Sequence, residues 1–322
     1  MSGHCMSADW RDRVCAQLEE SPATRDAPLA PLTTLRVGGP AELLVDVGSE
    51  ADLLRLLAVV RQEAVSCTVL GKGSNVLVPD EGLRGVVLRL GRAFQEFRYG
   101  ERADSVWGGA GLPNATFVER ARQLGLGGME FLVTIPGSLG GAIAMNAGAF
   151  QDEIARHLLS VRLLDLKRAE LAPQVRPAGE FTFRYRASPL RGQEGVLVLA
   201  GEFRLAPASD ADIEARKASH MTYRRDTQPR EFPNCGSVFK NPPGDFAARL
   251  IEQAGLKGQR RGGAQVSEKH ANFIVNRGGA AAAEVLDLID LIQRTVYDRS
   301  QIWLEPEVQW LGGQWLGPAA GR

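Results

Sequence analysis

The chain has 322 residues, a length that predicts two or three packed units rather than one small disulfide-stapled module. Its 38 Lys and Arg residues balance 38 Asp and Glu residues, so no global charge is available to hold nucleic acid or an anionic membrane. The four Cys residues form no CxxC pair and have no His partner at ligand spacing, which argues against a metal site. Without a secretory pattern or an apolar run of ~18 residues, we expect a soluble cytoplasmic protein.

Helix and strand patterns alternate along the first two thirds of the chain. Residues 1–30 are polar and weakly periodic, so we expect a loosely held lead-in with at most one short helix. Ser49 followed by Asp52 resembles a capping box, and leucines at helical spacing come after it. Strands are predicted at 67–70, 76–78, 85–88, 161–166 and 195–199, and a second helix at 114–124.

The pattern of the sequence becomes mainly helical after Pro207. The pattern there predicts a helix at about 210–221, a basic loop, a helix over 246–254 closed by Gly255, and a long helix over 281–297. We therefore expect a domain boundary near 205, which divides the chain into 1–30, 31–205 and 206–322.

Glycine is unusually frequent, at 36 residues, and it is clustered. The segment 69–77 (VLGKGSNVL) places a glycine turn between two predicted strands, where backbone N–H groups can converge on an anion, although an ordinary hairpin turn fits it equally well. It matches neither a Walker loop nor a Rossmann fingerprint. The segment 136–149 (PGSLGGAIAMNAGA) lets a flat ligand, or a closely packed helix, lie against backbone. A third piece, 34–40, adds Arg36, and together the three favour one extended cofactor.

These pieces carry a family resemblance. TLRVGGPA, LGKGSNVLV and IPGSLGGAIAMNAGA, in this order, resemble the FAD-binding half of the UDP-N-acetylenolpyruvoylglucosamine reductase (MurB) family, within the vanillyl-alcohol-oxidase type of flavoproteins. The resemblance implies an α+β protein with a two-part FAD-binding region over 31–205 and an α+β substrate domain over 206–322, whose C-terminal segment returns toward the active site. It implies contacts to FAD from Arg36, Gly71, Lys72, Gly73, Ser74, Asn75, Val76, Pro136, Gly137, Ser138, Gly140, Gly141, Asn146 and Gly148. FAD is expected to be non-covalent because the four His residues, His4, His157, His220 and His270, lie outside these loops.

Two arginines in the segment 183–188 (FRYRAS) are the next candidates. On a strand, Arg184 and Arg186 would face the same side, which also suits a salt-bridged surface strand. The segment resembles the Tyr-Arg-x-Ser motif of the family, which implies that Arg186 contacts the substrate carboxylate and that Tyr185 lies in the substrate site. Arginine suits this role because its planar fork grips a carboxylate bidentately.

The segment 234–242 (NCGSVFKNP) is the sharpest motif. Cys235 has no positioned base to make it a nucleophile, and the GxSxG pattern of hydrolases is absent. The resemblance to the family signature CGSVFKNP implies that Ser237 is the proton donor and that Lys240 and Asn241 contact substrate.

Two further charged segments remain. In 304–308 (LEPEV) either carboxylate could act as a base, or the segment could be an exposed edge strand; the family motif implies that Glu307, rather than Glu305, is catalytic. Tyr223, Arg224 and Arg225 could hold a diphosphate, although a solvated charge run explains them too.

The resemblance implies a cell-wall enzyme of the shorter subclass that lacks an extra tyrosine loop. NADPH and a UDP-linked enolpyruvyl sugar would be its substrates, FAD its cofactor, and UDP-N-acetylmuramate, a peptidoglycan precursor, its product. Arg186 would stabilise the negative charge that follows hydride transfer, Glu307 would assist, and Ser237 would supply the proton. The alternatives are an FAD oxidase acting on a hydroxy acid or lactone, and a non-catalytic UDP-sugar binding protein. No metal, nucleic acid, membrane or obligate protein partner is expected.

Overall fold

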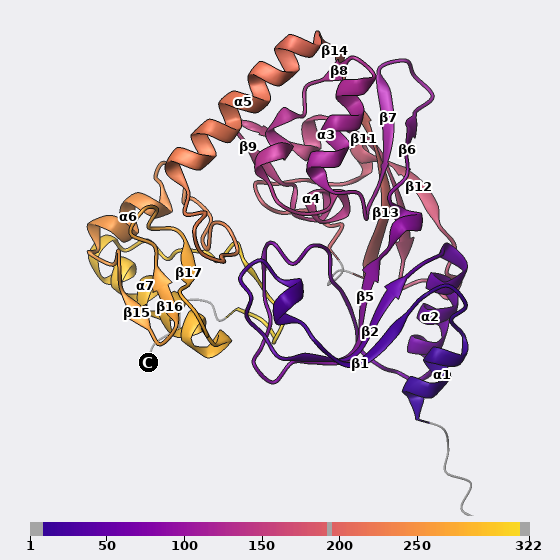
Figure 1. Ribbon diagram of the computed structural model, residues 1–322, viewed down its shortest axis with the longest axis horizontal. Coiled ribbons are helices and arrows are strands. Elements are labelled where there is room, and N and C mark those ends of the chain that lie inside the picture. The colour runs from indigo at the N-terminus through magenta and orange to yellow at the C-terminus, as the bar shows by residue number, and fades with distance from the viewer. Residues whose placement is uncertain (1–8, 192–194, 316–322) are drawn as a thin grey trace, which may run out of the picture.

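The computed structural model describes residues 9–191 and 195–315 (Figure 1). Its first unit is a four-stranded sheet in the order β1-β2-β5-β3, in which β5 pairs in parallel with β2 and β3 while β1 is antiparallel to β2. The bounds are β1 (Ala23–Pro28), β2 (Pro40–Val47), β3 (Cys67–Val69) and β5 (Leu83–Leu90). Helices α1 (Trp10–Ala16) and α2 (Glu50–Gln62) pack on this sheet through buried leucines and valines.

The expected lead-in is partly built into this unit. Residues 23–28 form β1, and Asp52, fully buried in α2, accepts hydrogen bonds from the backbone N–H of Glu20 (2.8 Å) and the hydroxyl of Ser21 (2.6 Å). Burial raises the pKa of Asp52, but these bonds and the Arg55 guanidinium outweigh it and hold the pKa well below its usual range. The N-terminal segment is thus fixed by a buried carboxylate, which polarity and weak periodicity did not indicate.

The second unit is an antiparallel five-stranded sheet in the order β12-β11-β13-β7-β6. Its strands are β6 (Phe97–Tyr99), β7 (Ser105–Gly109), β11 (Leu158–Asp165), β12 (Gln174–Pro177) and β13 (Val196–Arg204). Helices α3 (Asn114–Gln123) and α4 (Leu139–Met145) share its core, where the ring of Phe117 meets that of Phe203 edge-on at 5.1 Å between centroids. Two short pairs complete it: β8 (Leu126–Gly127) with β14 (Ala206–Pro207), and β9 (Gly148–Ala149) with β10 (Asp152–Glu153).

The third unit joins a small sheet, β15 (Arg260–Arg261), β16 (Ala264–Val266) and β17 (Ile274–Asn276), to helices α6 (Ala247–Gln253) and α7 (Ala282–Ser300). Its core also contains Leu35, Leu77 and Val308. The C-terminal strand β18 (Gln309–Trp310) pairs in parallel with β4 (Val76–Leu77), directly after the first glycine turn. The C-terminal segment therefore lies beside that turn, and its expected return toward the active site stays a prediction.

Helix α5 (Asp210–Thr227) runs from the end of the second unit to the third (Figure 1). It includes residues 222–227, which sequence reasoning placed in a basic loop. Arg224 and Arg225 suit the last turn of a helix because cations are favoured at its carboxyl end, and no Pro or Gly interrupts the chain before Pro229. The domain boundary near 205 stays a prediction.

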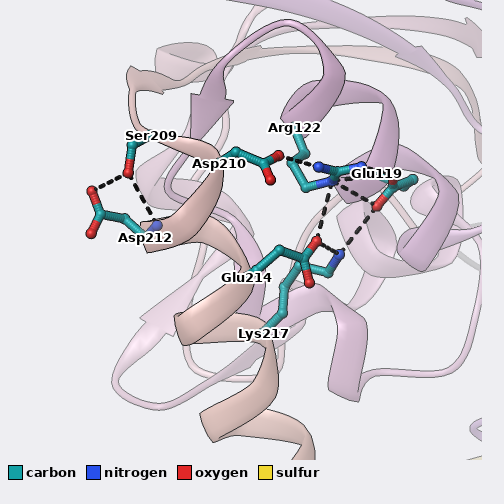
Figure 2. A network of polar contacts seen from close by, with 7 residues as sticks. All are labelled: Glu119, Arg122, Ser209, Asp210, Asp212, Glu214 and Lys217. Carbon is teal, nitrogen blue, oxygen red and sulfur yellow. Dashed lines mark hydrogen bonds and ion pairs between the residues drawn. The ribbon is translucent and has the colours of Figure 1, made fainter.

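The amino-terminal half of α5 is fastened to α3 by an ion-pair network (Figure 2). Arg122 contacts Glu119 and Asp210, and lies 3.2 Å from Glu214. Lys217 reaches both Glu119 (3.1 Å) and Glu214 (2.6 Å). Arg122, and then Lys217, lowers the pKa of Glu119 to about 2. These contacts fix the amino-terminal half of α5, while Tyr223 and Arg224 at its carboxyl end border a large cavity. Within the described ranges, no helix has the length and apolar character needed to cross a membrane.

Candidate active site

A cavity of about 1030 Å³ lies where the three units meet, and two glycine segments form one wall of it. A Cβ added to Gly71 would come within 2.9 Å of the Ser138 hydroxyl, and one added to Gly137, whose φ is +150°, within 3.2 Å of the Ser74 hydroxyl. The turn 71–75 and the segment 136–141 therefore face each other at a separation that side chains would fill. This narrow wall of backbone and hydroxyls fits the pyrophosphate of a dinucleotide such as FAD.

The wall contains most of the residues expected to bind the cofactor. They are Gly71, Lys72, Gly73, Ser74, Asn75, Val76, Pro136, Gly137, Ser138, Gly140, Gly141 and Gly148. Arg36 is exposed and does not border the cavity, whereas Thr34 from the same glycine piece does. Asn146 is also off the wall: it is fully buried, its amide donates to the Arg184 carbonyl at 3.0 Å, and its side-chain oxygen accepts from the Ala155 N–H at 3.0 Å.

Arg186 lies in a tight turn instead of on a strand. The N–H and carbonyl groups of Arg184 and Ala187 bond to each other, and Arg186 between them has a φ of +52°. The two arginines therefore do not share a strand face. The Arg186 guanidinium forms an ion pair with Glu307, at 3.0 Å between Nε and Oε1, and also donates to the Gly148 carbonyl. The turn thus directs Arg186 into the cavity between the glycine wall and the C-terminal segment.

Glu307 is held on both sides by backbone contacts. Its backbone N–H donates to the Val238 carbonyl at 2.7 Å, and its backbone carbonyl accepts from the side-chain amide of Asn75 at 3.2 Å. Burial raises the pKa of Glu307, and the charges of Arg186 and Lys240 oppose that shift without cancelling it. Glu305, its alternative, is exposed and pairs with Lys240, so the two carboxylates of this segment face different surroundings.

Ser237 borders the same cavity as Arg186 and Glu307. The chain approaches it through a bend in which the Asn234 side chain accepts from the Gly236 N–H at 3.1 Å and Gly236 has a φ of +80°. The neighbouring Cys235 is buried, and this burial raises the pKa of its thiol to about 12. A thiolate nucleophile is therefore disfavoured at this position, whereas the Ser237 side chain borders the cavity.

The residues expected to bind substrate divide into two groups. Tyr185, Tyr223, Arg224 and Asn241 border the cavity. Lys240 and Arg225 do not: Lys240 pairs with Glu305, and Arg225 pairs with Asp226 on the exposed side of α5 at 2.9 Å.

Sequence reasoning missed Arg230, which borders the cavity beside Arg224. Burial lowers the pKa of Arg224, and the charge of Arg230 lowers it further. Two guanidinium groups whose charges repel each other at a cavity wall suit a ligand with two or more negative charges. In the sequence, Arg230 reads as one more solvated charge after Pro229; only its place beside Arg224 sets it apart.

In comparisons with known proteins, two family models match separate parts of the chain. A family model described as FAD binding domain matches residues 41–171, and one described as UDP-N-acetylenolpyruvoylglucosamine reductase, C-terminal domain, matches residues 228–311. The fold and the glycine wall thus define a flavin-dependent oxidoreductase with a separate substrate-binding unit.

Relatives identify the family. The UDP-N-acetylenolpyruvoylglucosamine reductase 2 of Symbiobacterium thermophilum is 45% identical over 297 residues, 91% of this chain and 94% of that protein. The reductase of Anaeromyxobacter dehalogenans is 46% identical over 305 residues, 94% of this chain and 89% of its own. The crystal structure of UDP-N-acetylenolpyruvylglucosamine reductase (MurB) from Thermus caldophilus superposes with a TM-score of 0.75 at 37% identity, covering 90% of this chain and 98% of that one. The chain belongs to the UDP-N-acetylenolpyruvoylglucosamine reductase family. The expected family, fold class and FAD cofactor are confirmed.

Proposed function

We propose that this chain uses NADPH to reduce UDP-N-acetylglucosamine enolpyruvate to UDP-N-acetylmuramate, in peptidoglycan precursor synthesis. The observation that carries the proposal is that one cavity is bordered by the glycine wall, by the Arg186–Glu307 ion pair and by the Ser237 hydroxyl. FAD bound along residues 71–76 and 136–141 would supply the hydride for the enolpyruvyl carbon. None of the His residues in the described part of the chain borders the cavity, which supports non-covalent binding.

The side chains provide the rest of the chemistry. Addition of hydride leaves negative charge that spreads into the substrate carboxylate, and Arg186 would stabilise this charge. Its contacts with Glu307 and the Gly148 carbonyl, which restrain the guanidinium, support this role. The raised pKa of Glu307 favours its sharing a proton or hydrogen bond with the forming enolate. The Ser237 hydroxyl then delivers the proton that completes the lactyl ether.

The anionic part of the substrate needs a site of its own. Arg224 and Arg230, with Tyr223 beside them, support a diphosphate site at the carboxyl end of α5. The arginines bring two positive charges, and the tyrosine brings a hydroxyl and an exposed ring. Cytoplasmic location and the absence of a protein partner stay predictions from the sequence.

The test begins with the purified protein. We expect a flavin absorption band, and NADPH consumption that depends on the enolpyruvyl substrate. A colourless protein would favour a UDP-sugar binding role, and rapid reoxidation of the reduced flavin by O₂ without response to the substrate would favour an oxidase.

Ser237→Ala tests the proton donor. The variant should accept electrons from NADPH at the normal rate yet turn over the enolpyruvyl substrate about 10²- to 10⁴-fold more slowly, since that is the usual contribution of a positioned acid. Ser300→Ala is the control, because it removes a hydroxyl that donates to the Val296 carbonyl, accepts from the Ile302 N–H and does not border the cavity. Near-normal turnover of Ser237→Ala in stopped-flow measurements would remove Ser237 from the role.

A further inference from the structure

The β9–β10 hairpin presents a strained aromatic residue at its tip. Gly148–Ala149 pairs with Asp152–Glu153, so the turn between them consists of Phe150 and Gln151 alone. Both have positive φ, +54° and +63°. Turns of this kind favour Asn and Gly, and a bulky residue at positive φ is uncommon. Such strain persists where the surroundings determine the conformation, and it concentrates at functional sites.

The ring of Phe150 is directed at the end of α5. It stacks on His220, at 3.9 Å between centroids, and meets Tyr223 edge-on at 5.4 Å. His220 and Tyr223 are three residues apart and so share one face of the helix. Phe150 is still 41% exposed, which shows that the ring does not serve the core of its own unit. Its aromatic contacts reach across to the helix that carries Tyr223 and Arg224.

This part of α5 lies beside unfilled space, while the helix also packs against residues 130–134 of the second unit. A second cavity of about 310 Å³ lies there, bordered by Phe150, His220 and Arg216. Nearer the amino terminus the helix is fixed by the ion-pair network with α3 (Figure 2). Arg216 also pairs with Glu130 at 2.9 Å. Between these ion pairs and the last turn of α5, the ring of Phe150 at the hairpin tip contacts the helix, and this contact borders the second cavity.

The same hairpin also touches the catalytic side of the main cavity. The Gly148 carbonyl accepts from the Arg186 guanidinium, two residues before the ring that contacts Tyr223. One short, strained element thus contacts both Arg186, which we assign to the substrate carboxylate, and the end of α5, which we assign to the diphosphate. The sugar ring joins these two parts of the substrate and limits the distance between them, so their binding groups need a matching separation.

We propose that Phe150 is a positioning residue: its ring sets the place of Tyr223 and Arg224 relative to Arg186. The inference rests on the proposed function for its substrate, because it assumes that the carboxyl end of α5 binds the diphosphate. The placement of the helix end itself is independent of that assumption.

The test compares four variants of the full chain. Phe150→Ala removes the ring, Phe150→Gly removes the ring and also relieves the positive φ, and Phe150→Tyr keeps the ring. Tyr99→Ala, which removes an exposed aromatic residue on β6, is the matched control. For each variant we would measure hydrogen exchange of amides 220–227 and of β11, the affinity for UDP by calorimetry, and KM and kcat for the enolpyruvyl substrate.

We expect faster exchange at 220–227 but not in β11 for Phe150→Ala and Phe150→Gly, because only the helix end loses its contact. Their affinity for UDP should fall and their KM should rise about three- to tenfold, the size of one or two aromatic contacts, with kcat within about twofold. Phe150→Tyr and Tyr99→Ala should resemble the wild type. A loss in Phe150→Ala that Phe150→Gly restores would assign the effect to backbone strain and overturn the inference.

Unchanged hydrogen exchange of amides 220–227 in Phe150→Ala would also overturn the inference, whatever the substrate is. So would faster exchange there with undiminished affinity for UDP. Failure of the proposed function gives a different pattern: the wild type itself would neither bind UDP nor turn over the enolpyruvyl substrate, while the exchange measurements would still report whether Phe150 holds the helix end.

Discussion

Replacing Arg186 by glutamine removes the charge at the centre of the proposed site while keeping a polar side chain of similar length. Two unit charges 3.0 Å apart, the distance between Arg186 and Glu307, interact by about 5.5 kcal/mol at an effective dielectric of ~20 and by about 1.4 kcal/mol in bulk water. The two side chains are 19% and 17% exposed, which places the pair between these limits, at about 2–4 kcal/mol. A substrate carboxylate that gains charge at a similar distance would lose a comparable stabilisation.

We therefore expect Arg186→Gln to lower kcat about 10²- to 10³-fold, in line with the loss of one preorganised donor to a developing anion. Because the Arg186 charge opposes the rise in the pKa of Glu307, its removal should also move the pH limb that reports Glu307 to higher pH. Steady-state assays with the enolpyruvyl substrate across pH measure both effects. Arg184→Gln is the control, since that exposed arginine lies in the same turn but does not border the cavity. A less than fivefold loss in Arg186→Gln, or an equal loss in Arg184→Gln, would refute the reasoning.

Three further outcomes are expected. Glu307→Gln should abolish most turnover because it removes the buried carboxylate, whereas Glu305→Gln removes only an exposed partner and should remain within about twofold in the same assay. Gly71→Ala should weaken FAD retention, measured by absorbance after dialysis, because its methyl group would enter the narrow glycine wall; Gly179→Ala, where the structure has open space, should not. Asp52→Asn should lower the free energy of unfolding in urea at pH 7 by about 2–3 kcal/mol through lost charged hydrogen bonds. Because the folded pKa of Asp52 is depressed, this difference should stay constant down to the ordinary range of Asp and shrink only as pH falls below it; a difference that already shrinks well above that range would contradict the reasoning.

Local structure followed closely from local sequence. The Ser49 hydroxyl does cap α2 by accepting from the Asp52 N–H, and Gly255 with a φ of +73° does follow α6. In both cases the determining atoms lie within a few residues of one another, so propensity and pattern were sufficient. The error at residues 222–227 also has a local cause, because a run of charged residues is equally compatible with a loop and with the last turn of a helix.

The candidate site depended on what the sequence could not specify. Motif order selected Glu307 over Glu305 and Ser237 over Cys235, and the structure places these pairs in different surroundings. It also brought Arg230 to the cavity wall and turned the Asn146 side chain away from it. Neither outcome has a local signal, because each is decided by which distant segment packs alongside.

The sequence by itself therefore determined the family and the cofactor, because these follow from residue types in a fixed order, and most of the residues that it predicted for the site border the cavity. The tertiary structure alone decided that residues 23–28 complete the first sheet, that Arg186 reaches Glu307 from a turn, and that Phe150 meets α5. The physical reason is common to all three. Each contact joins segments of the chain that fold against one another through burial and hydrogen bonding, and the energy of that packing is a property of the assembled fold and not of any one segment.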